Sequence, residues 1–265
     1  MIERRKFIRY VGASCLAVIG GAFVSGKDTY QAQTATGSVT IQWLGHTCFL
    51  FTGNGLRVLV NPFETLGCTA GYQLPKVEAD VVLASSFLLD EGAVEKVAGK
   101  PQILTKSGDY QVKGLKFQGI SINHDREGGR RFGQNIAWRW NQGGINLLHL
   151  GGAAAPIEIE QKILMGSPDL ILVPVGGGPK AYNASEAIAA IAALKPKVVI
   201  PTQYLTEAAD KSNCDLDPVD NFLALAKDMQ VSRLNTNAIA IKPSDLPQQG
   251  TVVRVFSDSS LTGNQ

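Results

Sequence analysis

The chain has 265 residues, a length that can bury a hydrophobic core without disulfides or a structural metal. Its composition is ordinary for a globular α/β protein and excludes a disordered or collagen-like chain. Residues 1–35 hold five of the 25 basic and two of the 23 acidic residues, so the remaining chain has 20 and 21, a balance that excludes nucleic-acid binding by bulk charge.

The N-terminus is predicted to be an export signal. Its pattern is Arg4-Arg5-Lys6-Phe7-Ile8-Arg9, which resembles the twin-arginine motif, followed by an apolar run at residues 10–24. That run is shorter than the roughly 20 residues of a transmembrane helix and suits a signal peptide. We predict an export signal and linker at 1–35 and one domain at 36–265. The expected location is the periplasm or the thylakoid lumen, with membrane contact only through this signal, which would tether the chain if it is not cleaved.

Alternation and turn signals predict a strand-rich first half. Residues 39–60 alternate like two antiparallel strands joined at Asn54-Gly55, a strong hairpin signal. The apolar run 79–85 predicts a buried strand, and residues 90–98 are expected to form a short helix. Further strands are expected in the segments 101–122, 136–140 and 145–150.

The second half alternates strands with helices. Asn183 and Glu186 form a capping box, which predicts a helix that runs to Lys195 and stops before Pro196. Pro218 is expected to occupy the first position of another helix. Strands are expected at 170–175, 197–200 and 252–256. A strand-rich block followed by helix–strand units predicts an α/β protein with two packed sheets flanked by helices.

A series of short motifs follows these expected strands. In chain order they are Gly45-His46-Thr47-Cys48, Val60-Asn61-Pro62-Phe63, Ser86-Phe87-Leu88-Leu89-Asp90-Glu91, Asn123-His124-Asp125, His149-Leu150-Gly151-Gly152, Pro174-Val175-Gly176-Gly177 and Pro201-Thr202-Gln203. Together they resemble the metallo-β-lactamase-fold hydrolase superfamily, and within it the ascorbate-phosphate lactonase-like branch. The resemblance implies the four-layered αββα sandwich of that fold.

The resemblance also implies a two-metal site, whose ligands in the family are His, His, Asp and His from one motif and His, Asp and His from later loops. The corresponding positions here are Ser86, Leu88, Asp90, Glu91, His124, Gly152 and Gln203. Leu and Gly offer no donor atom, and Ser and Gln are poor zinc ligands beside imidazole. We therefore expect no metal cofactor. The alternative is zinc or manganese held by Asp90, Glu91 and His124.

The same motifs supply the candidate site. Asp90 and His124 are the candidate catalytic residues, and the predicted pocket is lined by His46, Ser86, Leu88, Glu91, Gly152 and Gln203. His46 is either a structural support of the site or a group with a ligand or acid–base role. His149, in the middle of an expected strand, is predicted to satisfy a buried hydrogen bond.

Three neighbouring features leave alternatives open. Phe87, Leu88 and Leu89 predict an apolar cavity floor, hence a ligand of apolar or mixed character. The loop 125–131 is either solvated or an anion site that uses Arg130 or Arg131. The cysteines at positions 48, 68 and 214 form no C-x-x-C pair. A Cys48–Cys68 disulfide is compatible with an oxidising compartment, but the sequence does not place it.

Two functions fit these observations, and whether the protein is an enzyme stays open. The first is an exported, non-catalytic binding or assembly protein, whose partner is an unidentified small molecule or protein. The second is a hydrolase of a small ester, lactone or phosphoester with a remnant or rebuilt metal site. The coordinated loss of ligands favours the first. Twin-arginine export, which carries folded and often cofactor-loaded proteins, favours the second.

Overall fold

The computed structural model describes residues 37–259 and residue 261, which belong to the unit Thr34–Gln265. The export signal predicted at residues 1–35 lies outside the described residues, as does the proposed domain boundary at residue 36, and both stay predictions. Within the described ranges, none of the helices has the length and apolar character needed to cross a bilayer.

The first sheet has six strands in the order β13-β1-β2-β3-β4-β5. In that order they are β13 (Ala238–Ile241), β1 (Val39–Gly45), β2 (Cys48–Gly53), β3 (Leu56–Val60), β4 (Val81–Leu83) and β5 (Gln102–Leu104). The Asn54-Gly55 turn joins β2 to β3, and both residues have positive φ, as a tight hairpin requires. Residues 39–60 form three strands and not the predicted two, because His46 adopts a φ of 52° and turns the chain between β1 and β2.

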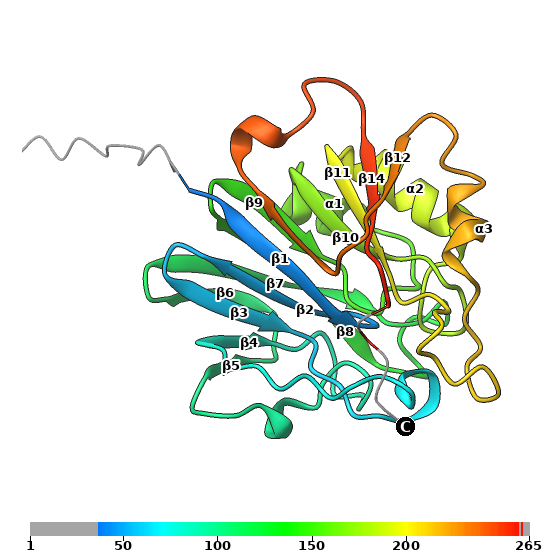
Figure 1. Cartoon of the computed structure of the whole chain (residues 1–265), viewed down its shortest axis with the longest axis horizontal. Helices are drawn as coiled ribbons and strands as arrows, with labels where there is room; N and C mark the ends of the chain where they lie inside the picture. The colour runs from blue at the N-terminus through cyan, green and yellow to red at the C-terminus, as the bar shows by residue number, and fades with distance from the viewer. Residues whose placement is uncertain (1–36, 260, 262–265) are drawn as a thin grey trace, which may run out of the picture. The chain divides into compact units, whose positions relative to one another are not determined.

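The second sheet has eight strands in the order β12-β14-β11-β10-β9-β8-β7-β6. They are β6 (Gly108–Val112), β7 (Leu115–Asn123), β8 (Gln134–Gln142), β9 (Ile145–His149), β10 (Leu170–Pro174), β11 (Val198–Thr202), β12 (Gln230–Arg233) and β14 (Val252–Val255). The strands β9, β10, β11 and β14 are parallel, whereas β6 to β9 form an antiparallel meander. Figure 1 shows the two sheets and the helices beside the second one.

Three α-helices lie among the described residues: α1 (Ile159–Met165), α2 (Ala184–Leu194) and α3 (Val219–Leu223). The predicted capping box of α2 is confirmed, since Asn183 accepts a hydrogen bond from the Glu186 amide. Lys195, in the left-handed region, ends that helix before Pro196. All three helices follow strands of the eight-stranded sheet. The described connections of the six-stranded sheet carry only the short 3-10 turns η1 (Gly67–Thr69), η2 (Val94–Lys96) and η3 (Pro243–Asp245).

Several local predictions need correction. The helix predicted at 90–98 is wrong, because the chain there forms only the short turn η2. The elements α1, β12 and β13 were not predicted. The helix α1 and the strand β12 are short and largely exposed, so they carry little of the hydrophobic periodicity that reveals an element in a sequence. The strand β13 has only four residues, all apolar, with no alternation between apolar and polar positions.

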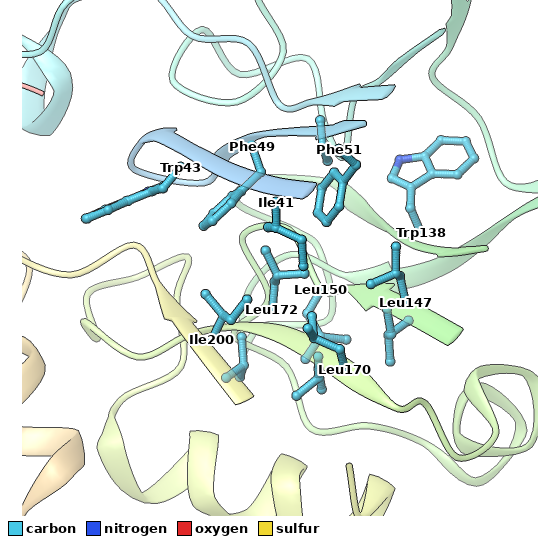
Figure 2. Close-up of a cluster of buried hydrophobic side chains, with 14 of the residues drawn as sticks. Ile41, Trp43, Phe49, Phe51, Trp138, Leu147, Leu150, Leu170, Leu172 and Ile200 are labelled. Atoms are coloured by element: carbon cyan, nitrogen blue, oxygen red, sulfur yellow. The ribbon is translucent and has the colours of Figure 1, made fainter. Parts of the chain in front are cut away.

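The main core lies between the two sheets. Figure 2 shows Trp43, Phe49 and Phe51 of β1 and β2 facing the aliphatic side chains of β9, β10 and β11. Leu170 and Ile200 are among these, and all are fully buried. A polar contact also joins the sheets, since Trp138 Nε1 of β8 donates to the Ala84 carbonyl at 3.1 Å. The predicted α/β fold with two packed sheets is confirmed.

One disulfide joins two surface loops. It links Cys68 to Cys214 across 146 residues of chain, with Cα atoms 4.4 Å apart. The suggested Cys48–Cys68 pair is wrong, because Cys48 lies on β2 with its side chain fully buried in the core. The pairing ties the loop after β3 to the loop after β11.

The buried aromatic side chains between the sheets, Trp43, Phe49 and Phe51, should contribute strongly to the stability of the fold. We expect Phe51→Ala to lower the free energy of unfolding by about 3–5 kcal/mol, because it opens a cavity in the core. The matched control is Phe87→Ala, whose side chain is 74% exposed and whose loss should change stability by no more than about 0.5 kcal/mol. Urea unfolding measures both, and equal midpoints for the two variants would contradict this packing.

The disulfide should contribute separately. We expect Cys214→Ser to lower the free energy of unfolding by about 2–5 kcal/mol, because the unfolded chain is no longer cross-linked. Dithiothreitol should bring the wild-type unfolding midpoint down to that of the variant and leave the variant unchanged. A wild-type midpoint that does not respond to reductant would refute the pairing.

Candidate functional site

The candidate site lies where the carboxyl ends of strands from both sheets meet. The loop after β4 carries Asp90 and Glu91, and the eight-stranded sheet supplies His124 after β7, Gly152 after β9 and Gln203 after β11. Contacts across the two sheets bring most of these predicted residues together.

Glu91 and His124 form the most deeply buried contact of the site. Glu91 Oε1 lies 2.9 Å from His124 Nε2, and both side chains are at most 1% exposed. The Ser86 hydroxyl donates to the same carboxylate oxygen at 2.9 Å. Burial disfavours the charged carboxylate, but the adjacent His124 outweighs it, and the pKa of Glu91 is lowered. Glu91 is therefore ionised at neutral pH, with a nitrogen partner from the other sheet.

A side chain at position 152 would clash with this pair unless Glu91 or His124 moved. A Cβ built on Gly152 would lie 2.7 Å from His124 Nε2 and 2.8 Å from Glu91 Oε2, closer than real Cβ contacts allow. Its amide donates to Asn135 Oδ1 at 3.1 Å, which fixes the backbone in place. The Glu91–His124 pair therefore fills the space that an aspartate at position 152 would need.

Asp90 faces a second nitrogen partner from the other sheet. Lys180, in the loop between β10 and α2, forms an ion pair with Asp90 Oδ2. His46 Nε2 approaches the same oxygen at 3.7 Å. Burial opposes ionisation, but His46 and Lys180 together hold the pKa of Asp90 well below its usual range. Asp90 is thus a fixed carboxylate with an ammonium beside it.

Lys180 is a site residue that the sequence prediction missed. It lies three residues beyond the Pro174-Val175-Gly176-Gly177 motif, in a loop of small residues. A lysine in such a loop is expected to be exposed to solvent, so the sequence alone gives no reason to select it as a site residue.

His46 and Gln203 close the site on the side of the first hairpin. Both residues are buried, with φ angles of 52° and 50°. The backbone amide of Gln203 donates to the His46 carbonyl at 3.4 Å. Trp43 Nε1 donates to that carbonyl as well. Among the described residues, His46 Nε2 and Gln203 Oε1 have no hydrogen-bond partner. Their backbone is held tightly, while their polar side-chain atoms stay available to this site.

His149 is a structural residue, as predicted. The Gly151 amide donates to its Nδ1 at 3.0 Å, so Nε2 carries the proton and donates to the Thr47 carbonyl at 3.0 Å. Burial lowers the pKa of His149 to about 4. A neutral imidazole therefore joins β9 to the first hairpin.

The predicted apolar cavity floor is wrong. Phe87 is 74% exposed and Leu89 is 49% exposed, while Leu88 is only partly buried. The reason is a tight turn, in which the Leu88 amide donates to Ser86 Oγ and the Leu89 carbonyl accepts from the Glu64 amide. The turn points these side chains outward and returns Glu91 to the interior.

The loop after His124 is organised by Asp125. Its buried carboxylate accepts hydrogen bonds from the amides of Glu127, Gly129, Arg131 and Phe132 at 2.8–3.1 Å. Arg131 lies over the Phe132 ring, 4.8 Å from its centroid. The loop is thus an ordered support for His124. The anion site through Arg130 or Arg131 stays a prediction.

The donor set as it stands does not fit a metal ion. Among the residues that the structure describes, no group of three or more His, Cys, Asp or Glu side chains is arranged to hold one. Asp90 is already paired with an ammonium, and Glu91 with His124. A metal site needs about three or four N, S or O donors around one point. The candidate trio Asp90, Glu91 and His124 is instead divided between the Asp90–Lys180 ion pair and the Glu91–His124 contact.

Comparison with known proteins agrees with this architecture. The sequence model of the Beta-lactamase superfamily domain matches residues 40–203. A UPF0173 metal-dependent hydrolase of Thermococcus onnurineus is 28% identical in an alignment 197 positions long that covers 63% of this chain and 85% of that protein. A second one, from Archaeoglobus fulgidus, is 23% identical over 77% of this chain and 96% of its own length.

A solved structure is similar over most of the chain. It is a presumed Zn-dependent hydrolase of the metallo-beta-lactamase superfamily from Thermotoga maritima, with a TM-score of 0.65 and 28% identity. The match covers 83% of this chain and 100% of that structure.

The Asp125 loop should give a measurable pH dependence. Burial raises the pKa of Asp125, but the hydrogen bonds from four backbone amides lower it by more. The net pKa therefore lies below the ordinary value of 3.8. This carboxylate therefore stabilises the fold above that pH, and the contribution is lost as the pH falls through the lowered pKa. We expect the stability gap between wild type and Asp125→Asn to be largest at pH 7 and to narrow below about pH 4. Urea unfolding against pH measures it. Asp228→Asn, at an exposed position, is the control, and its stability gap from wild type should not change with pH. An equally pH-independent gap for Asp125→Asn would contradict the stabilising role of the Asp125 carboxylate.

Proposed function

The chain belongs to the metallo-beta-lactamase superfamily, and we propose that within it this protein is an exported, non-catalytic binding or assembly protein that works without a metal. The observation that carries the proposal is the Glu91–His124 pair, which occupies the space beside Gly152. Hydrolysis in a metal-dependent site relies on a cation that acidifies water and polarises the substrate. The contacts of Asp90 with Lys180 and of Glu91 with His124 engage these donors within the protein, which supports a function without a metal.

The partner is proposed to contact the turn beside the site. Phe87 and Leu89 expose apolar surface in the same loop as Asp90, which is paired with Lys180, so this loop combines apolar side chains with a fixed charge. Aromatic side chains are enriched in the cores of contact surfaces, whose rims are polar. This arrangement suits a small molecule or a protein segment of mixed apolar and polar character.

Export is supported by two features. The twin-arginine-like N-terminus motivates it, and the Cys68–Cys214 pair is the kind of bond that persists in oxidising compartments. The proposed location is the periplasm or the thylakoid lumen, with the signal, if uncleaved, as the membrane tether.

The second candidate is a hydrolase of a small ester, lactone or phosphoester. It is favoured by the relatives, which are named metal-dependent hydrolases. It is also favoured by the unpartnered His46 Nε2 beside Asp90, since buried polar atoms without partners are often reserved for a ligand. In this case zinc or manganese would have to rearrange Asp90, Glu91 and His124 into one ligand set.

Metal content distinguishes the two candidates. We expect the exported protein to contain far less than one metal ion per chain after challenge with zinc and manganese, measured by inductively coupled plasma mass spectrometry. Lactone and phosphoester turnover should equal that of Asp90→Ala and His124→Ala, because the wild-type protein would have no metal-activated water. About one tightly held metal per chain, lost in His124→Ala together with turnover, would favour the hydrolase.

A further inference from the structure

Two adjacent carboxylates enter the site from the six-stranded sheet, and each meets a nitrogen group from the eight-stranded sheet. Asp90 pairs with Lys180, which follows β10, and Glu91 pairs with His124, which follows β7. Both contacts therefore cross from one sheet to the other. A metal held by ligands from both sheets would make the same kind of cross-link.

The loop that carries Lys180 is fixed independently of Asp90. Arg126 donates to the carbonyls of Gly178 and Ala181 at 2.8 and 2.9 Å, and it forms an ion pair with Glu186. The Gly177 amide donates to the Tyr182 carbonyl at 2.8 Å, which closes the loop around Lys180. These contacts, which do not involve Asp90, therefore hold the Lys180 ammonium beside the Asp90 carboxylate.

The charge at this position has a clear physical need. The side chains of Asp90 and Lys180 are only 14% and 23% exposed, and Glu91 follows Asp90 directly in the chain. Two neighbouring carboxylates in a poorly hydrated region repel each other and lose solvation unless a positive group is close. Lys180 supplies that positive group, and it also favours the ionised form of Glu91.

We propose that Lys180 is a built-in replacement for the metal cation: its ammonium neutralises Asp90, joins the two sheets at the site and keeps divalent cations away from the carboxylates. This inference rests on the proposed metal-free function. Like charges repel strongly over a few ångströms where water is scarce, so a cation near Asp90 would have to displace the ammonium. Removal of the Lys180 charge should therefore open the carboxylates to an added metal ion.

The test compares thermal unfolding of the exported full-length protein with and without zinc. Lys180→Met keeps most of the side-chain volume and removes the charge. It should lower Tm by about 3–8 °C in the presence of EDTA, because one partner of a partly buried ion pair is lost. Zinc should then raise the Tm of this variant by several degrees. Zinc should leave wild type unchanged.

Two matched variants complete the design. Lys180→Arg keeps the positive charge and should stay insensitive to zinc. Asp90→Asn combined with Lys180→Met removes the proposed zinc-binding carboxylate and should abolish the response to zinc.

The possible failures can be told apart. If Lys180→Met loses stability but gains no zinc response, Lys180 is only a structural ion pair and the replacement is refuted. If Lys180→Met has the Tm of wild type, the cross-sheet link is refuted as well. If zinc stabilises wild type itself, the metal-free function has failed, and this result is visible without any variant.

Discussion

Neutralisation of two adjacent carboxylates is the constraint on which this site depends. Asp90 and Glu91 are consecutive in the chain and both are withdrawn from solvent. Carboxylates in such a place need a positive or hydrogen-donating partner, or they become protonated. The fold provides one nitrogen group for each, Lys180 and His124, and both come from the opposite sheet. The electrostatic requirement and the packing of the two sheets are therefore met by the same contacts.

The fold makes this solution possible because strands from both sheets end at one edge. The inter-sheet core sets the distance between the sheets, and the polar contacts of Trp138 and His149 fix it near the site. Small residues allow the close approach, since Gly152 leaves the room that Glu91 and His124 occupy. Protein groups from both sheets thus contact the two carboxylates in a scaffold that in its relatives is named for metal-dependent hydrolysis. The shared fold does not by itself assign the activity.

Local signals in the sequence predicted local structure well. The Asn54-Gly55 turn and the Asn183 cap were predicted from short-range rules, and both are confirmed, because each depends on residues within a few positions of one another. The helix predicted at 90–98 failed where tertiary contacts override propensity: Glu91 is drawn toward His124, and the Ala93 amide donates to the Pro62 carbonyl. The strand β12 is mostly exposed and lacks an apolar pattern, and β13 has only four residues, all apolar, with no alternation that would indicate a strand.

The sequence by itself determined the family, the two-sheet fold and the identity of the residues at the positions of the family's metal ligands, because these follow from the order of motifs along the chain. Only the tertiary structure decided what those residues do. It paired Cys68 with Cys214, turned Phe87 outward and brought Lys180 to Asp90. Each of these pairings joins positions far apart in the sequence or depends on the direction of a side chain. Charge neutralisation across two sheets is a property of the space between them, which no segment of the chain encodes alone.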